Sequence, residues 1–184
     1  MSRSAAPPTR ITAHSTSLIC QDVDLRGDIT IGPGVVVHPK ASILALGGPI
    51  VIGAECVIEE TVIIVNRGTE IMKIGDGNHF MVGSRIESPS IGDHNTFQPR
   101  CKASSGVIIT DNCTLGAGTI LLPLPTLPPN TTETLPPYTV IFGADSDRRI
   151  WDGSGEVAEK ALRGKHIEYL REVIPKYNRL RAAG

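Results

Sequence analysis

The sequence predicts an all-β solenoid: a parallel β-helix of about six to seven coils, followed by a C-terminal α-helix packed on or beside the prism. Three observations lead to this prediction. Large aliphatic side chains recur every six residues, a small or narrow side chain stands two positions before most of them, and aromatic residues make up only 4% of the 184 residues. A period of six fits neither an α-helix nor a half-buried strand, whereas three such units close one coil with every sixth side chain pointing inward.

The six-residue series defines the inward-facing positions. Its members are Leu25, Ile31, Val37, Ile43, Ile52, Ile58, Ile64, Ile74, Phe80, Ile86, Ile91, Phe97, Ala103, Ile109, Leu115 and Leu121. A narrow prism lined by one aliphatic and one small side chain in six has little space for rings, so it explains the scarcity of aromatic residues. Phe80 and Phe97 are exceptions in matching repeats.

The coil corners carry a second repeat, in which glycine follows the aliphatic residue. It begins at Ile31, Ile52, Ile74 and Ile91. These starts are 21, 22 and 17 residues apart, which is one coil of eighteen with small insertions or a deletion. Counting back one coil from Ile31 places the first strand near Ile11. Asn78 and Asn95 occupy the same place in two corners, which predicts stacked side-chain amides.

The repeat also predicts the organisation of the chain. We expect a flexible N-terminus at 1–10, the β-helix at 11–145 and a helical segment at 146–184. Three insertions interrupt the repeat at 44–51, 65–73 and 123–137. The third contains six prolines, which cannot donate to a strand ladder. This segment must therefore leave the coil before Leu135 re-enters it.

Composition excludes several classes of protein. A formal net charge of −1 argues against a nucleic-acid partner, because such binding neutralises phosphates with Lys and Arg. No apolar run approaches the ~18 residues of a membrane span, and the N-terminus has no signal-peptide core, so we expect a cytoplasmic protein. Its cysteines should be reduced. They form no Cys-x-x-Cys pair, and three of the four occupy the small position of the repeat, which favours a role as core filler.

The six-residue spacing stops after Gly143, and the segment from Gly155 to Arg181 is typical of an α-helix. An apolar stripe runs through Ile167, Leu170, Ile174 and Tyr177. We expect Pro175 to kink or divide this helix. Seven basic and four acidic residues give the segment a charge of +3. The favoured interpretation is that the stripe covers a face of the prism. Binding of a partner, or of a membrane surface, stays open.

No catalytic, cofactor-binding or metal-binding residues are predicted. Residues 26–28, 50–65 and 74–88 resemble the gamma-class carbonic anhydrase family, which binds zinc through three histidines. The corresponding positions here are Val65, Val82 and Glu87, so that site is not expected. A hexapeptide acyltransferase would need a histidine base. His38, His79 and His94 fall at different phases of the repeat, so we do not expect them to form one cluster.

Five segments resemble one family closely, the dynactin subunit six family. They are residues 26–43, 48–64, 91–97, 140–151 and the tail 170–180. The resemblance implies a left-handed coil and a non-catalytic subunit of the pointed-end complex of dynactin, active in cargo binding and microtubule-based transport. It also implies a cytoskeleton-associated hetero-oligomer. The implied partners are dynactin subunit five, itself a β-helix, dynactin subunit four and the pointed-end actin-related protein. The alternative is a β-helix enzyme of either type above.

Candidate interface residues follow from their chemistry. Arg and Trp are enriched in binding hot spots, so the exit from the prism, Arg148, Arg149, Ile150 and Trp151, is one candidate. In the alternative interpretation, the two arginines pair with Asp145, Asp147 or carbonyl groups of the end coil, and Trp151 caps the core. The helix stripe Ile167, Leu170, Ile174 and Tyr177 is the second candidate. We expect Arg26 and Asp28 to form a structural ion pair across coils.

Overall fold

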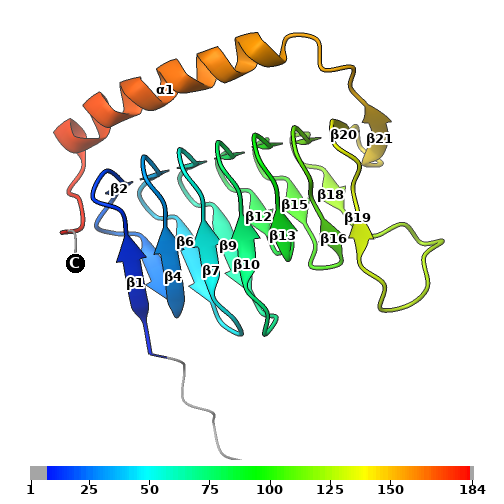
Figure 1. Ribbon diagram of the computed structural model, residues 1–184, viewed down its shortest axis with the longest axis horizontal. Coiled ribbons are helices and arrows are strands. Elements are labelled where there is room, and N and C mark those ends of the chain that lie inside the picture. Colours follow the sequence, from blue (N-terminus) through cyan, green and yellow to red (C-terminus); the bar gives the residue numbers. More distant parts are fainter. Residues whose placement is uncertain (1–7, 183–184) are drawn as a thin grey trace, which may run out of the picture.

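Three parallel sheets wind around one core in the computed structural model, which describes residues 8–182 (Figure 1). Each coil contributes one short strand to each sheet. The chain therefore advances along the prism by one strand spacing, about 4.8 Å, with every coil. A single helix runs beside the prism, from the last coil back to the first (Figure 1).

Up to β20, every third strand along the chain belongs to the same sheet. The first sheet contains β1 (Arg10–Ala13), β4 (Asp28–Ile31), β7 (Ile50–Ile52), β10 (Met72–Ile74) and β13 (Ser90–Ile91). The second contains β2 (Leu18–Ile19), β5 (Val36–Val37), β8 (Val57–Ile58), β11 (His79–Phe80), β14 (Thr96–Phe97), β17 (Thr114–Leu115), β20 (Thr139–Phe142) and β21 (Asp147–Ile150). The third contains β3 (Asp24–Arg26), β6 (Ser42–Ala45), β9 (Ile63–Asn66), β12 (Arg85–Ile86), β15 (Lys102–Ala103) and β18 (Ile120–Leu121).

A short pair, β16 (Val107–Ile108) and β19 (Glu133–Thr134), continues the first sheet. An isolated bridge between Ile91 and Ile109 joins this pair to β13. Six strands in the third sheet and seven parallel strands in the second, leaving out antiparallel β21, confirm the predicted six to seven coils.

The core is built from stacks of like side chains. Ile31, Ile52, Ile74 and Ile91 stand in register on successive strands of the first sheet, and all four are buried. In the second sheet the matching stack includes the Phe80 and Phe97 rings, whose centroids lie 4.6 Å apart. Because each inward residue meets its equivalent one coil away, the six-residue period becomes continuous apolar contact along the prism.

Polar ladders close the corners. The Asn78 Oδ1 atom accepts a hydrogen bond from the Asn95 backbone N–H at 2.9 Å, which confirms the predicted amide stack. Asn95 repeats the pattern, because its Oδ1 atom accepts from the Cys113 N–H at 2.7 Å. The corners are also tight: a Cβ atom at Gly75 would lie 2.7 Å from the carbonyl oxygen of Gly92. Glycine is therefore required where neighbouring coils meet.

The insertions leave the prism at its edges. Asn66 ties the first two together, since its Nδ2 atom donates to the carbonyl oxygens of Pro49 at 3.0 Å and Glu70 at 2.8 Å. The proline-rich segment leaves the coil after β18 and returns at β19 (Figure 1). Leu135, which follows β19, is buried in the core.

Helix α1 (Glu156–Tyr177) packs three side chains against the prism: Ile167, Leu170 and Ile174. Tyr177, predicted as the fourth member of this stripe, is instead 79% exposed. Tyr177 is the last residue of the helix, and its side chain borders an open hollow beside Pro39 instead of entering the packed contact. The prediction that Pro175 divides the helix is also wrong. Pro175 stands in the last turn, and the helix ends two residues later with the Asn178 N–H donating to the Ile174 carbonyl.

The C-terminal segment covers both ends of the second sheet. β21 pairs antiparallel with β20 at one end. At the other, the chain after α1 forms an antiparallel bridge from Leu180 to Cys20, flanked by two backbone hydrogen bonds of 2.8 Å between residues 179–181 and 19–21. The first sheet still ends on β1 and the third on β3 and β18. Residues 1–7, most of the N-terminus predicted to be flexible, lie outside the described residues.

Candidate functional site

The three positions that match a zinc-binding pattern have other environments. Val65 is buried in β9, and Val82 is exposed at a corner. The Glu87 carboxylate forms ion pairs with Arg85 at 2.7 Å and with Arg67 at 3.7 Å. In the described part of the chain, no group of three or more His, Cys, Asp or Glu side chains is arranged to hold a metal ion.

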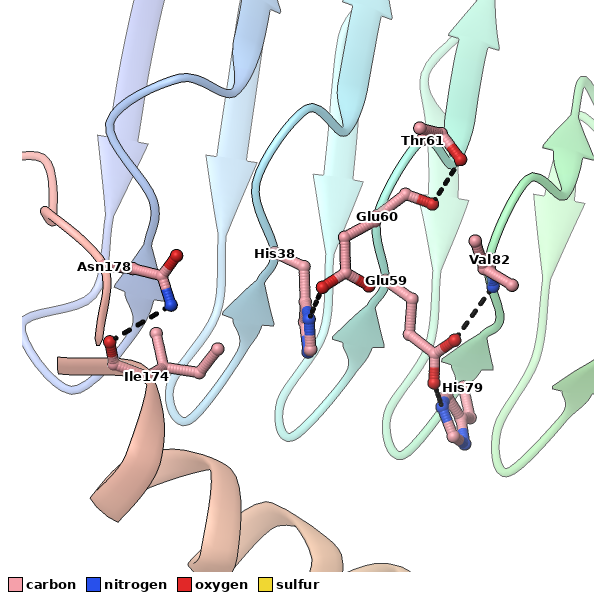
Figure 2. A network of polar contacts seen from close by, with 8 residues as sticks. All are labelled: His38, Glu59, Glu60, Thr61, His79, Val82, Ile174 and Asn178. Carbon is pink, nitrogen blue, oxygen red and sulfur yellow. Dashed lines mark hydrogen bonds and ion pairs between the residues drawn. The ribbon is translucent and has the colours of Figure 1, made fainter. Parts of the chain in front are cut away.

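Two histidines on the second sheet are each held by a glutamate from the next or the preceding coil (Figure 2). The His79 Nε2 atom donates to Glu59 Oε1 at 2.7 Å, and His38 Nδ1 donates to Glu60 Oε1 at 3.0 Å. The second oxygen of Glu59 accepts the Val82 N–H at 2.9 Å. The histidines stay in separate pairs, as their phases in the repeat indicated.

The structure adds a histidine that the repeat could not place. Helix α1 brings the His166 ring to 5.4 Å from the His79 ring, measured between centroids. Burial lowers the pKa of His166, and the charge of His79 lowers it further. Burial works to raise the pKa of Glu59, but the hydrogen bonds from His79 and the Val82 N–H outweigh it and lower that pKa. Glu59 therefore stays ionised, and its carboxylate holds His79 in place.

Two polar contacts from Arg163 fasten the same part of the helix to the prism. Its guanidinium donates to the Gly77 carbonyl oxygen at 2.5 Å and to Thr96 Oγ1 at 2.6 Å. Beside these contacts lies an open groove of about 580 Å³, between α1 and the outer face of the second sheet. The helix contributes Leu162, His166 and Tyr169 to it, and the sheet contributes His79, Met81 and Gln98.

The cysteines are core residues without nucleophilic character. All four are buried and free: Cys20, Cys56, Cys101 and Cys113. Burial raises the pKa of Cys20 to about 11 and the pKa of Cys56 and Cys101 to about 12. Since the thiolate is the reactive form, these side chains pack as small apolar groups.

The exit from the prism is folded onto the last coil. Arg148 forms an ion pair with Glu133 and donates to the Leu122 carbonyl oxygen at 2.7 Å. Of the partners named in the alternative interpretation, Arg148 contacts a carbonyl oxygen of the end coil and neither Asp145 nor Asp147. Antiparallel pairing of β21 causes this, because it turns Arg148 toward the returning strand β19.

Of the three residues that follow Arg148, two pack against aromatic rings and one is exposed. The Arg149 guanidinium lies 5.4 Å from the centre of the Phe142 ring, and the Trp151 ring packs edge-on against Tyr138 at 5.9 Å. Ile150, in contrast, is 61% exposed. Further exposed apolar side chains lie on the last coil and the loop after it: Ile120, Leu122 and Leu124. We call Ile120, Leu122, Leu124, Phe142 and Ile150 the C-terminal end surface. Ile120 and Leu122 border Lys102 on the outer face of the third sheet, whereas Phe142 and Ile150 belong to β20 and β21 of the second sheet.

The predicted ion pair between Arg26 and Asp28 does not form. Arg26 instead pairs with Asp24 at 2.8 Å, and Asp28 stands opposite Arg10 in the first sheet. Gly27 explains the difference, because its positive φ of 84° turns the chain between the third and the first sheet. Arg26 and Asp28 therefore lie on different faces of the prism.

The fold defines a class of protein, the left-handed β-helices built from hexapeptide repeats. A hexapeptide transferase family protein from Anaplasma phagocytophilum superposes with a TM-score of 0.73, over 89% of this chain and 92% of that one, at 13% identity. A putative acetyltransferase from Bacillus cereus superposes with a TM-score of 0.54 at 15% identity, over 89% and 91% of the two chains. At these identities the likeness concerns the fold alone.

Sequence comparison identifies the family. Dynactin subunit 6 of Danio rerio is 32% identical over 177 residues, which cover 90% of this chain and 84% of the relative. Dynactin subunit 6 of Dictyostelium discoideum is 44% identical over 128 residues, 64% of this chain and 68% of the relative. No family model matches the chain. The chain belongs to the dynactin subunit 6 family.

Proposed function

We propose that the chain is a non-enzymatic structural subunit of dynactin, and that it joins the complex through its C-terminal end surface. Family membership supports the dynactin role. The observation that supports this mode of docking is the group of exposed apolar side chains on the last coil, on and beside the edge strand β18. Exposed apolar patches of this kind mark interaction sites. The strand edge itself is partly covered, because the Ile120 N–H donates to Ser146 Oγ at 2.9 Å and the Leu122 carbonyl oxygen accepts from Arg148, so the apolar side chains are the proposed contact.

The proposed partners are other pointed-end subunits. Dynactin subunit five is the first proposed partner, because a second β-helix would present an end coil of similar cross-section. Dynactin subunit four and the pointed-end actin-related protein complete the proposed set. In this function the protein works in the cytoplasm on the microtubule cytoskeleton and supports cargo binding by dynein and dynactin. Among the described residues, no helix is long and apolar enough to span a bilayer.

Co-purification with light scattering tests this function. The chain should form a one-to-one complex with dynactin subunit five, and Ile150→Glu should weaken that complex at least tenfold. Ile71→Glu is the matched control, because Ile71 is an exposed isoleucine in the second insertion, away from the end surface. A homotrimer that contains zinc or turns over acyl-CoA would instead establish the enzyme alternative. Equal binding by both variants would refute docking through the C-terminal end.

A further inference from the structure

Helix α1 carries a second apolar stripe besides the one buried against the prism. It consists of Leu162, His166, Tyr169, Val173 and Tyr177. Successive members are four, three, four and four residues apart, so they lie on one side of the helix. Leu162 is 69% exposed and Tyr169 60% exposed, whereas His166 and Val173 are half-buried. The prism therefore leaves a second packing face of this helix largely uncovered.

The stripe borders a groove rather than open solvent. Leu162, His166 and Tyr169 form the helix wall of the 580 Å³ groove, and Met81 and Gln98 of the second sheet form part of its floor. Further along the helix, Tyr177 lines a second hollow with Pro39 of the first coils. The stripe from Leu162 to Tyr177 spans about 22 Å at 1.5 Å per residue, or about four helical turns.

The geometry favours a helix as the occupant. A stripe whose members are three or four residues apart is the kind of surface that packs against another helix. An extended strand would need unpaired backbone groups, but the floor of the groove is the face of a sheet whose strands are paired on both sides. Helix-in-groove recognition anchors a partner through side chains spaced in the same way.

The charges define the partner further. The groove is lined by one acidic side chain, Glu159, and by two basic ones, Arg163 and Lys165. Arg163 is bound to the prism, whereas Lys165 forms no ion pair with a described residue. The segment as a whole carries +3. A second copy of this helix would bring like charges together, whereas a helix with acidic flanks would complement them.

We propose that the groove between α1 and the second sheet binds an amphipathic helix of a partner protein, with its apolar face on Leu162 and Tyr169 and acidic side chains toward Lys165. This site is distinct from the C-terminal end surface, and the two can fail independently. Tyr169 is the expected anchor, because a rigid aromatic side chain beside a pocket dominates many interfaces.

Fluorescence anisotropy with two synthetic probes tests the proposal. The first probe is an 18-residue amphipathic helix with leucines on one face and glutamates beside them, and the second has lysine at every glutamate. The full chain should bind the acidic probe at least tenfold more tightly than the basic one. The double variant Leu162→Ser/Tyr169→Ser should lose at least tenfold in affinity, and Lys165→Glu should weaken the acidic probe several-fold.

Val157→Ser is the matched control. Val157 is an apolar residue of the same helix, 83% exposed but off the stripe, so its variant should bind within twofold of the wild type. Unchanged thermal unfolding of each variant shows that the fold is intact. Failure to bind the acidic probe, or equal binding by the double variant, would overturn the proposal. A dimer in light scattering that Leu162→Ser/Tyr169→Ser dissociates would assign the groove to a second copy instead.

Discussion

Replacing Asn95 by alanine should cost a large share of the stability of the β-helix. Asn95 is fully buried, and its side chain links two coils: its Oδ1 atom accepts the Cys113 N–H at 2.7 Å, and its Nδ2 atom donates to the Thr110 carbonyl oxygen at 2.8 Å. Alanine removes both bonds and leaves a buried donor and a buried acceptor unpaired. Each such group costs about 1–3 kcal/mol, so the free energy of unfolding should fall by about 2–6 kcal/mol.

Urea unfolding followed by far-UV circular dichroism measures this loss. At about 3 kcal/mol, the midpoint of thermal unfolding should fall by roughly 6–12 °C. Thr126→Ala is the control, since Thr126 lies exposed in the proline-rich insertion, and its variant should stay within about 0.5 kcal/mol of the wild type. If Asn95→Ala matched this control, the corner ladder would not contribute to stability, and the role given to the stacked amides would be wrong.

Two further predictions concern the attachment of the helix. Leu170→Ala should weaken helix docking by about 2–4 kcal/mol through the cavity it leaves, seen as faster amide hydrogen exchange in α1 with the coils still protected; protection equal to wild type would contradict the packing. Lowering the pH from 7 to 5.5 should also loosen the helix. Burial and His79 lower the pKa of His166 below the ~6.5 of an unfolded chain, so docking is strongest above that value and weakens as the opened state takes up protons. In amide hydrogen exchange corrected for the intrinsic rate at each pH, His166→Gln should remove the part of the pH dependence that comes from His166. An unchanged pH dependence in this variant would show that another group titrates.

The coil was predictable because each residue of a repeat meets its own equivalent. Ile52 packs on Ile31 and Ile74 in neighbouring coils. The spacing of residues in the sequence therefore determines which side chains meet in the folded protein. The Asn78 and Asn95 stack was predictable for the same reason. Their side chains occupy one position in consecutive corners, which lie one strand spacing apart.

Contacts that involve the non-repeating segment were not predictable in this way. The contact between His79 and His166 depends on where α1 lies along the prism, and the pair of Arg148 with Glu133 depends on the return of the chain after the proline-rich insertion. Neither position follows from a local period. The misjudged pair of Arg26 has a different cause, since two residues adjacent to Gly27 look close in sequence but belong to different sheets.

The arrangement of the C-terminal segment connects stability to assembly. Strand edges at the ends of a solenoid invite uncontrolled pairing, and proteins ordinarily cover them. Here β21 and the residues after α1 cover both ends of the second sheet, while the first and third sheets still end on edge strands. One sheet is thus covered by strand pairing within the chain. The edge of β18 is covered only in part, by the bonds of its Ile120 N–H to Ser146 and of the neighbouring Leu122 carbonyl to Arg148. A coil that were fully capped would be a better isolated protein and a poorer subunit, so partial capping is the feature of this fold that best fits a role in a larger complex.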